Sequence, residues 1–171
     1  MSSPSCPLYE SSVPVFLRYL PRLAGLVDKA AEAAAGDAAV LLAARLAPDM
    51  LPFESQVQIA AHFALRACFP LAGQPVPDFG EFPSGFDGLR DRIARAIALL
   101  QDLAPAQFEA GPDRLLRERA GQAELALPAV EFLHHYALPN FFFHLSCAYA
   151  ILRARGLALG KQDFDGFHRY G

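Results

Sequence analysis

Apolar residues recur at steps of three and four along much of this sequence, which is the spacing of helices that bury one face. Four long helices are predicted, over about residues 12–36, 53–69, 84–100 and 128–156. Stretches rich in proline and glycine separate them, among them APDMLPF and LAGQPVPDFGEFPSG, and these are expected to be loops. Since helices with one apolar face must pack against one another, the pattern predicts an all-α bundle.

Several short features are expected between and beyond these helices. Ser12 is expected to cap the first long helix, and Asp37 to cap a short extra helix through about Leu46. Ser84 begins an S-x-x-D capping box that ends at Asp87. The stretch RLLRERAGQAELAL loses the helical period and predicts a small β-hairpin that turns near residues 120–121. The tail after the last long helix is expected to be a loop.

Length and composition point to one domain, residues 1–171. No apolar run reaches the roughly 20 residues of a membrane span, and no secretory signal is visible at the N-terminus, so no membrane partner is expected. A formal charge of −3 without a basic patch argues against nucleic acid. Three widely spaced cysteines without a CxxC pair predict free thiols in a reducing cytoplasm.

A group of polar side chains falls on or beside the predicted core faces of two helices. Asn140 and His144 are four residues apart in the last helix, beside its core stripe, and Cys147 continues the same line. His62 lies in the second long helix among small alanines that allow close packing. Imidazoles from two helices could converge on one divalent ion such as zinc, nickel or iron, with the amide of Asn140 as a weak, neutral ligand.

Each of these residues also has a structural explanation. A buried histidine is more often hydrogen-bonded to protein than bound to metal. Asn140 directly follows Pro139 and can instead satisfy backbone groups that a proline kink sets free. Cys147 reads as a small buried hydrophobe. The aromatic run 141–143 is wider than one helical face, so part of it is expected to meet another subunit or the hairpin. No phosphate-binding loop, nucleophile elbow or HExxH motif is present.

Five phrases distributed along the chain resemble a known family. They are VPVFLR (13–18), LAPDM (46–50), QVQIA (56–60), LPNFFFH (138–144) and AYAILR (148–153). The chain resembles the DinB/YfiT-like bundles, a bacterial superfamily of metal-binding four-helix proteins, and within it an uncharacterised group with these phrases. The resemblance implies an up-down-down-up four-helix bundle with a short extra helix, a small β-hairpin before the last helix, and a homodimer.

The resemblance also implies a set of metal ligands. Metal-binding members take one histidine from the second helix, here His62, and an H-x-x-x-H pair from the last helix. In this chain the pair falls on Asn140 and His144, so it reads N-x-x-x-H and should hold a divalent ion more weakly. His135 or another side chain could complete the set, or the metal could be lost.

Three functions are compatible with these residues. The first, which the sequence slightly favours, is a weak or degenerate divalent-metal site that acts on a small molecule, by thiol transfer or hydrolysis as in better-known relatives. The second is a metal-free bundle that binds a small apolar ligand, with the same residues as pocket hydrogen-bonding groups. The third is a structural or regulatory dimer without catalytic activity. The sequence names no reaction and no substrate.

Overall fold

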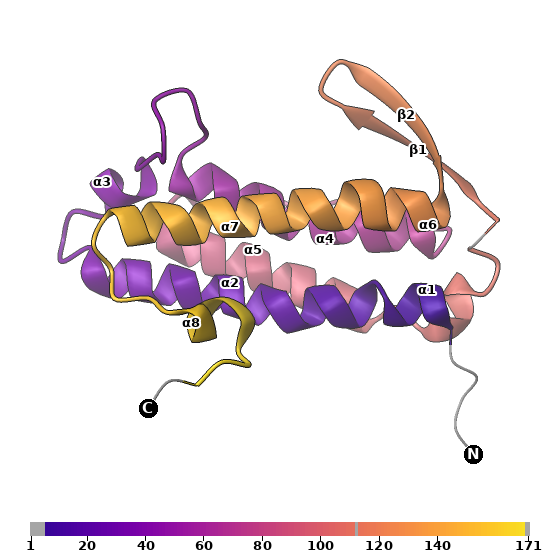
Figure 1. Cartoon of the computed structure of the whole chain (residues 1–171), viewed down its shortest axis with the longest axis horizontal. Helices are drawn as coiled ribbons and strands as arrows, with labels where there is room; N and C mark the ends of the chain where they lie inside the picture. The colour runs from indigo at the N-terminus through magenta and orange to yellow at the C-terminus, as the bar shows by residue number, and fades with distance from the viewer. Residues whose placement is uncertain (1–5, 112, 170–171) are drawn as a thin grey trace.

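Four helices of 16 or more residues lie side by side in the part of the chain that the computed structural model describes, residues 6–111 and 113–169 (Figure 1). They are α2 (Val13–Ala33), α4 (Phe53–Leu71), α5 (Phe86–Gln101) and α7 (Leu138–Ala154). α7 continues the helical path of α6 (Ala129–Glu131) and a π-helical segment, η2 (Phe132–Ala137). The prediction of a mostly helical fold is confirmed.

Shorter elements decorate the bundle. They are α1 (Pro7–Glu10), α3 (Ala38–Leu42), the 3-10 turn η1 (Pro105–Phe108), the strands β1 (Leu115–Ala120) and β2 (Ala123–Pro128), and α8 (Lys161–Asp165). The strands form the predicted hairpin, which is antiparallel and projects from the bundle in Figure 1. Its two-residue turn begins at Gly121, whose φ of 62° is a left-handed conformation that glycine adopts without strain.

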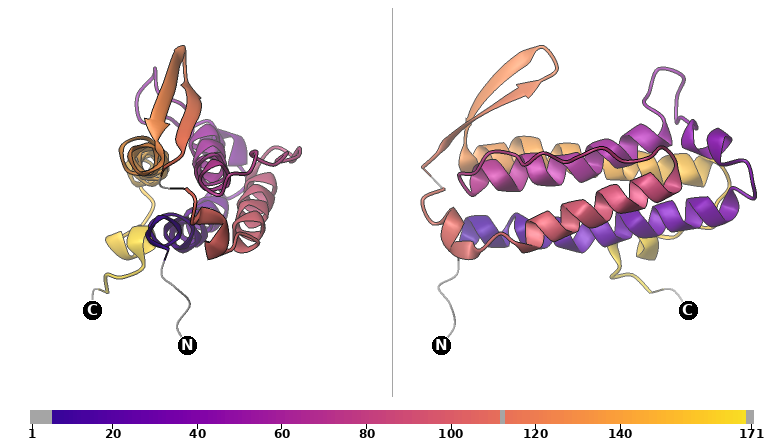
Figure 2. Two further views of the ribbon diagram at one scale, coloured as in Figure 1. Left: turned by 90° about the vertical axis from the view of Figure 1, so that its right-hand side faces the viewer. Right: turned by 180° about the vertical axis from the view of Figure 1, so that it is seen from behind.

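The core forms where the apolar faces of the helices meet. α4 packs against α7 on one side and α5 on the other, while α2 packs mainly against α5. Edge-to-face ring pairs join α2 to α7, with centroids 4.9 Å apart for Phe16 and Phe141 and 4.8 Å apart for Tyr19 and Phe142. The segment 72–85 runs back along the outside of the bundle before α5 begins, as Figure 2 shows from behind.

The predicted core stripe of the last helix is buried except at its first member. The buried members are Leu133, Ala137, Phe141, Leu145, Ala148 and Leu152. The predicted first member, Val130, is instead 47% exposed. The reason is η2, since a π-helical segment has more residues per turn and rotates the residues before it away from the regular helical step. Pro139, which cannot donate to the carbonyl of His135, stands in the first turn of α7 just after this segment.

Three predicted side-chain caps, those of Ser12, Asp37 and Ser84, are not formed, although Ser12 and Asp37 do occupy N-cap positions. The hydroxyl of Ser12 donates to the carbonyl of Leu8, 2.6 Å away, because the residues before it already form the unpredicted helix α1. Ser84 does not cap α5. Gly85 occupies the N-cap with a φ of 95°, and its N–H donates to the carboxylate of Glu54, 3.2 Å away on α4. Both hydrogen bonds depend on neighbours that the predicted local motifs do not contain.

The predicted boundaries also need correction in two places. The short helix α3 ends at Leu42 rather than near Leu46, and Asp37 makes no side-chain cap there. The tail is not all loop, since it contains α8. A five-residue helix is unstable alone, and α8 is held by an ion pair of 2.7 Å between Asp163 and Lys29 of α2.

Two further predictions can be compared with the structure. All three cysteines, Cys6, Cys68 and Cys147, are buried free thiols, as expected. None of the helices in the described ranges combines the length and the apolarity that crossing a bilayer requires.

Candidate functional site

His144 is held by a buried relay between α4 and α7. Its Nδ1 atom lies 2.7 Å from Oε1 of Gln56, and Nε2 of Gln56 donates to the carbonyl of Leu51 at 3.2 Å. Because the amide nitrogen is engaged by Leu51, the amide oxygen faces the imidazole, and that oxygen can only accept. Nδ1 therefore carries the ring proton, and Nε2 of His144 presents a lone pair.

The Nε2 atom of His144 is the chemically available end of this relay. Every buried polar side-chain atom of the described residues has a hydrogen-bond partner. Nε2 of His144 has no such partner among these residues, so this atom is not fully buried and solvent reaches it. The ring stacks on Phe63 at 5.9 Å and meets Phe143 edge-on at 5.2 Å. Burial lowers the pKa of His144, so the imidazole is neutral at neutral pH. The α4–α7 seam, meaning the contact around Gln56, Phe63 and His144, thus offers one oriented base.

His62 lies outside this seam. It is one helical step, about 100°, away from Phe63, the residue that stacks on His144. Its half-buried ring stacks on Phe79, in the loop before α5, at 5.7 Å. Burial, and then the charges of two nearby arginines, lower the pKa of His62. We call this side of the helix, which carries His62 and Arg66, the outer face of α4.

Asn140 bonds to the backbone, but at Tyr136 rather than at His135, whose carbonyl Pro139 leaves without its helical donor. Its amide nitrogen donates to the carbonyl of Tyr136 at 2.7 Å, within the turn where η2 passes into α7. Among the described residues no hydrogen bond or ring contact joins His62 to Asn140 or to His144. The structure therefore gives each of the three predicted residues its own partners.

The donor set does not fit a closed metal site. Across the part of the chain that the structure describes, no three His, Cys, Asp or Glu side chains come close enough together to hold an ion. His144 alone has the fixed tautomer and the accessible nitrogen that a metal ligand needs. His62 lies beside two cations instead, and the charges of Arg66 and Arg92 disfavour a divalent ion there.

The other side chains considered from the sequence are not brought to the seam as reactive groups. His134 and His135 are exposed, and Nδ1 of His134 pairs with the carbonyl of Val130 at 3.0 Å. Cys147 is buried, and burial raises the pKa of its thiol, so it is a poor nucleophile at neutral pH.

Sequence reasoning missed an arginine that ties the hairpin to the bundle. Arg66 forms an ion pair of 2.9 Å with Glu118 of β1 and donates at 3.4 Å to the hydroxyl of Tyr136 in η2. Its guanidinium also lies over the ring of Phe63, 4.6 Å from the centroid. Although burial opposes the charged form, the hydrogen bond and charge of Glu118 raise the pKa of Arg66. No local signal marks this contact, because Glu118 is distant in sequence.

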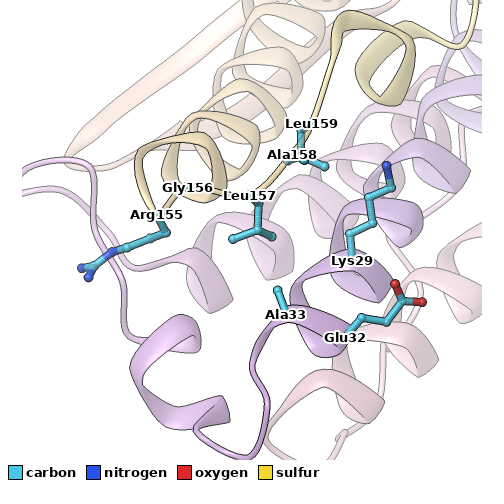
Figure 3. Close-up of a pocket in the computed structure, with 8 residues that line it drawn as sticks. All are labelled: Lys29, Glu32, Ala33, Arg155, Gly156, Leu157, Ala158 and Leu159. Atoms are coloured by element: carbon cyan, nitrogen blue, oxygen red, sulfur yellow. The ribbon is translucent and has the colours of Figure 1, made fainter.

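A surface hollow of about 590 Å³ lies elsewhere, where the end of α2 meets the segment after α7 (Figure 3). The side chains of Lys29, Glu32 and Arg155 diverge from one another there, as Figure 3 shows. Lys29 is already paired with Asp163, and none of the predicted site residues lines the hollow. It is therefore not the better candidate despite its size, because it brings no polar groups together.

The helical bundle with its small hairpin places the chain in the DinB-like class of proteins. A crystal structure of a DinB family member protein from Shewanella denitrificans is similar to it, with a TM-score of 0.83 and 33% sequence identity. The similarity covers 96% of this chain and 94% of that one. No curated protein matches the chain. Residues 8–165 match the model of the family described as Domain of unknown function (DUF1993), and the chain belongs to that family.

Proposed function

We propose that this DinB-like chain binds a small molecule in the α4–α7 seam, with Nε2 of His144 as the principal polar contact. The observation that carries the proposal is the relay from Leu51 through Gln56 to His144, which fixes the ring and leaves Nε2 as an acceptor. The exposed ring of Phe143 supplies apolar surface beside that ring, and the buried ring of Phe63 packs against its face. An oriented polar atom among aromatic side chains is the usual composition of a small-molecule site.

The ligand that fits this arrangement has an apolar body and one hydrogen-bond donor. Because the imidazole of His144 is neutral, it accepts from a hydroxyl, amine or thiol without requiring a charged partner. The same nitrogen could take a proton from that group, as a general base does. We propose binding rather than a reaction, since no second titratable group of the described residues pairs with Nε2.

A phenol titration tests this proposal, because phenol combines a neutral ring with one O–H donor. The chelator-treated protein is followed through the ring nitrogen signals of His144. We expect Nε2 to shift saturably, Nδ1 to shift less, and binding to disappear in His144→Ala. His135→Ala is the matched control, since it removes an exposed imidazole from the same helical rod. Unchanged signals in the wild type, or equal binding by His144→Ala, would overturn the proposal.

A divalent metal is the second candidate, and the same relay supports it. Proteins commonly orient a metal-bound histidine by a hydrogen bond from its other ring nitrogen, as Gln56 provides for His144. Asn140 and His62 would have to leave their present partners to act as further ligands, so this would be a weak site for zinc, nickel or iron. Saturating the untagged protein with each metal should then raise the melting temperature. If added metal neither binds nor raises the melting temperature of the wild type, or does both equally in His144→Ala, this candidate is excluded.

We also propose that two copies of the chain associate. Separately, we propose that the four long helices follow the up-down-down-up order of DinB-like bundles. The exposed ring of Phe143 (54%), at the end of the aromatic run 141–143, supports a partner copy on α7. The return of residues 72–85 along the bundle supports the helix order (Figure 2). Light scattering after gel filtration should give a dimer for wild type and a lower mass for Phe143→Ser. A monomeric wild type would contradict the dimer.

A further inference from the structure

Among the residues that the structure describes, Arg92 differs from the other half-buried arginines in having no acceptor. Arg66, Arg90 and Arg114 each donate to a carboxylate or a backbone carbonyl. The guanidinium of Arg92, on α5, makes no hydrogen bond or ion pair within the described chain. Burial lowers the pKa of Arg92, because no acceptor offsets it. A partly desolvated cation without a counterion is unfavourable, and its donors are available to a ligand.

Two aromatic rings hold this guanidinium in place. It lies 4.6 Å from the ring centroid of Phe82 and 5.1 Å from that of Phe79, both in the segment 72–85. The two rings pack edge to face at 5.4 Å, and Phe79 is buried. Stacking on two rings restricts the guanidinium, so its fork of N–H donors is oriented before any ligand arrives.

His62 brings a second set of free polar atoms to the same ring. It stacks on Phe79, and neither of its nitrogens has a hydrogen-bond partner among the residues described. One of these nitrogens carries a proton in the neutral ring and can donate it. Phe79 therefore has an unpaired guanidinium from α5 and an unpaired imidazole from α4 around it.

No acidic side chain of the described residues pairs with Arg92. Glu118 is the acidic neighbour of His62, and it is already paired with Arg66 at 2.9 Å. The two carboxylates of the segment that carries the rings, at positions 78 and 81, form no ion pair with Arg92. The guanidinium of Arg92 is therefore left without a carboxylate partner among the described residues, and an anionic group could take that place.

We propose that Arg92 and His62 form an oxyanion-binding subsite beside Phe79, which takes a carboxylate or phosphate group of a small molecule. Arg92 supplies a two-pronged, charge-assisted contact, and His62 supplies a single N–H. The subsite lies on the outer face of α4, whereas the α4–α7 seam contains His144, so the two proposals can fail separately.

Titration of chelator-treated protein with acetate and with inorganic phosphate, at constant ionic strength, tests the subsite. The readout is the Nε–H signal of Arg92 in nitrogen-edited NMR spectra, assigned with Arg92→Lys. We expect a saturable shift, and a dissociation constant raised about tenfold or more in Arg92→Gln, measured by calorimetry. Arg95→Gln, at an exposed position on the same helix, should bind as wild type does.

The two anions separate the sources of the ligand group. A response to acetate indicates a carboxylate, and a response to phosphate indicates a phosphate ester. The absence of any saturable shift of Arg92 in the wild type would overturn the proposal, even if the variants do not fold. Equal losses in Arg92→Gln and Arg95→Gln would also overturn it, since they would indicate a general effect of surface charge.

Discussion

Replacing Gln56 with leucine should destabilise the protein through His144. Leucine has a similar size but accepts no hydrogen bond, so Nδ1–H of His144 loses its partner. Gln56 is 1% exposed and His144 is 9% exposed, so solvent compensates little. A buried donor left unpaired costs about 1–3 kcal/mol. For a chain of this length that loss should lower the melting temperature by about 2–12 °C.

Urea denaturation followed by circular dichroism measures this free energy of unfolding. A double-mutant cycle with His144→Leu isolates the contact, and we expect a coupling energy of about 0.5–3 kcal/mol between the two positions. The ring nitrogen spectrum gives a second readout, because His144 can move its proton to Nε2 when the acceptor is gone.

Gln58→Leu is the matched control for this experiment. Gln58 lies on the same helix, is half-buried, and has no hydrogen-bond partner within the described ranges, so its replacement should change stability by no more than about 0.5 kcal/mol. If Gln56→Leu and His144→Leu are additive, or if Gln58→Leu costs as much as Gln56→Leu, the relay does not fix His144.

Three further predictions address pH, the hairpin and the core. Burial lowers the pKa of His144 in the folded state below 6.5. As the pH falls, His144 therefore binds its proton in the unfolded chain before it does so in the folded one, and the free energy of unfolding should decrease below pH 6.5. The contribution of this group to that decrease is at most about 1.4 kcal/mol per pH unit. Parallel pH profiles for wild type and His144→Leu would contradict this. Arg66→Met should make hairpin amides exchange hydrogen about fivefold faster, as loss of about 1 kcal/mol implies, and unchanged exchange would refute the anchoring role. Phe141→Ala should cost about 3–5 kcal/mol in urea denaturation, because its ring is buried. Phe143→Ala should cost under about 0.5 kcal/mol at protein concentrations where the chain is monomeric, because its ring is exposed in the single chain; similar costs would show that the core is misplaced.

The sequence determined the long elements because their signals are local. Apolar spacing predicts the four helices to within a few residues, except that the last is interrupted by η2, and the loss of that spacing predicts the hairpin. It also offered a local backbone hydrogen bond as one role for Asn140, whose amide nitrogen donates to the carbonyl of Tyr136 one turn earlier. These conclusions depend on residues within one or two turns of each other.

Only the tertiary structure decided which polar side chains meet. The sequence predicts that His62 and His144 approach one another. In the structure His144 pairs with Gln56, whereas His62, one helical step from the seam residue Phe63, lies beside Phe79. The contact of Arg66 with the hairpin likewise joins segments that no local pattern relates. The physical reason is that the sequence period fixes which residues share a face of a helix, but not how the helix is rotated about its own axis; packing against its neighbours sets that rotation. The π-helical segment η2 changes the rotation again within the last helix.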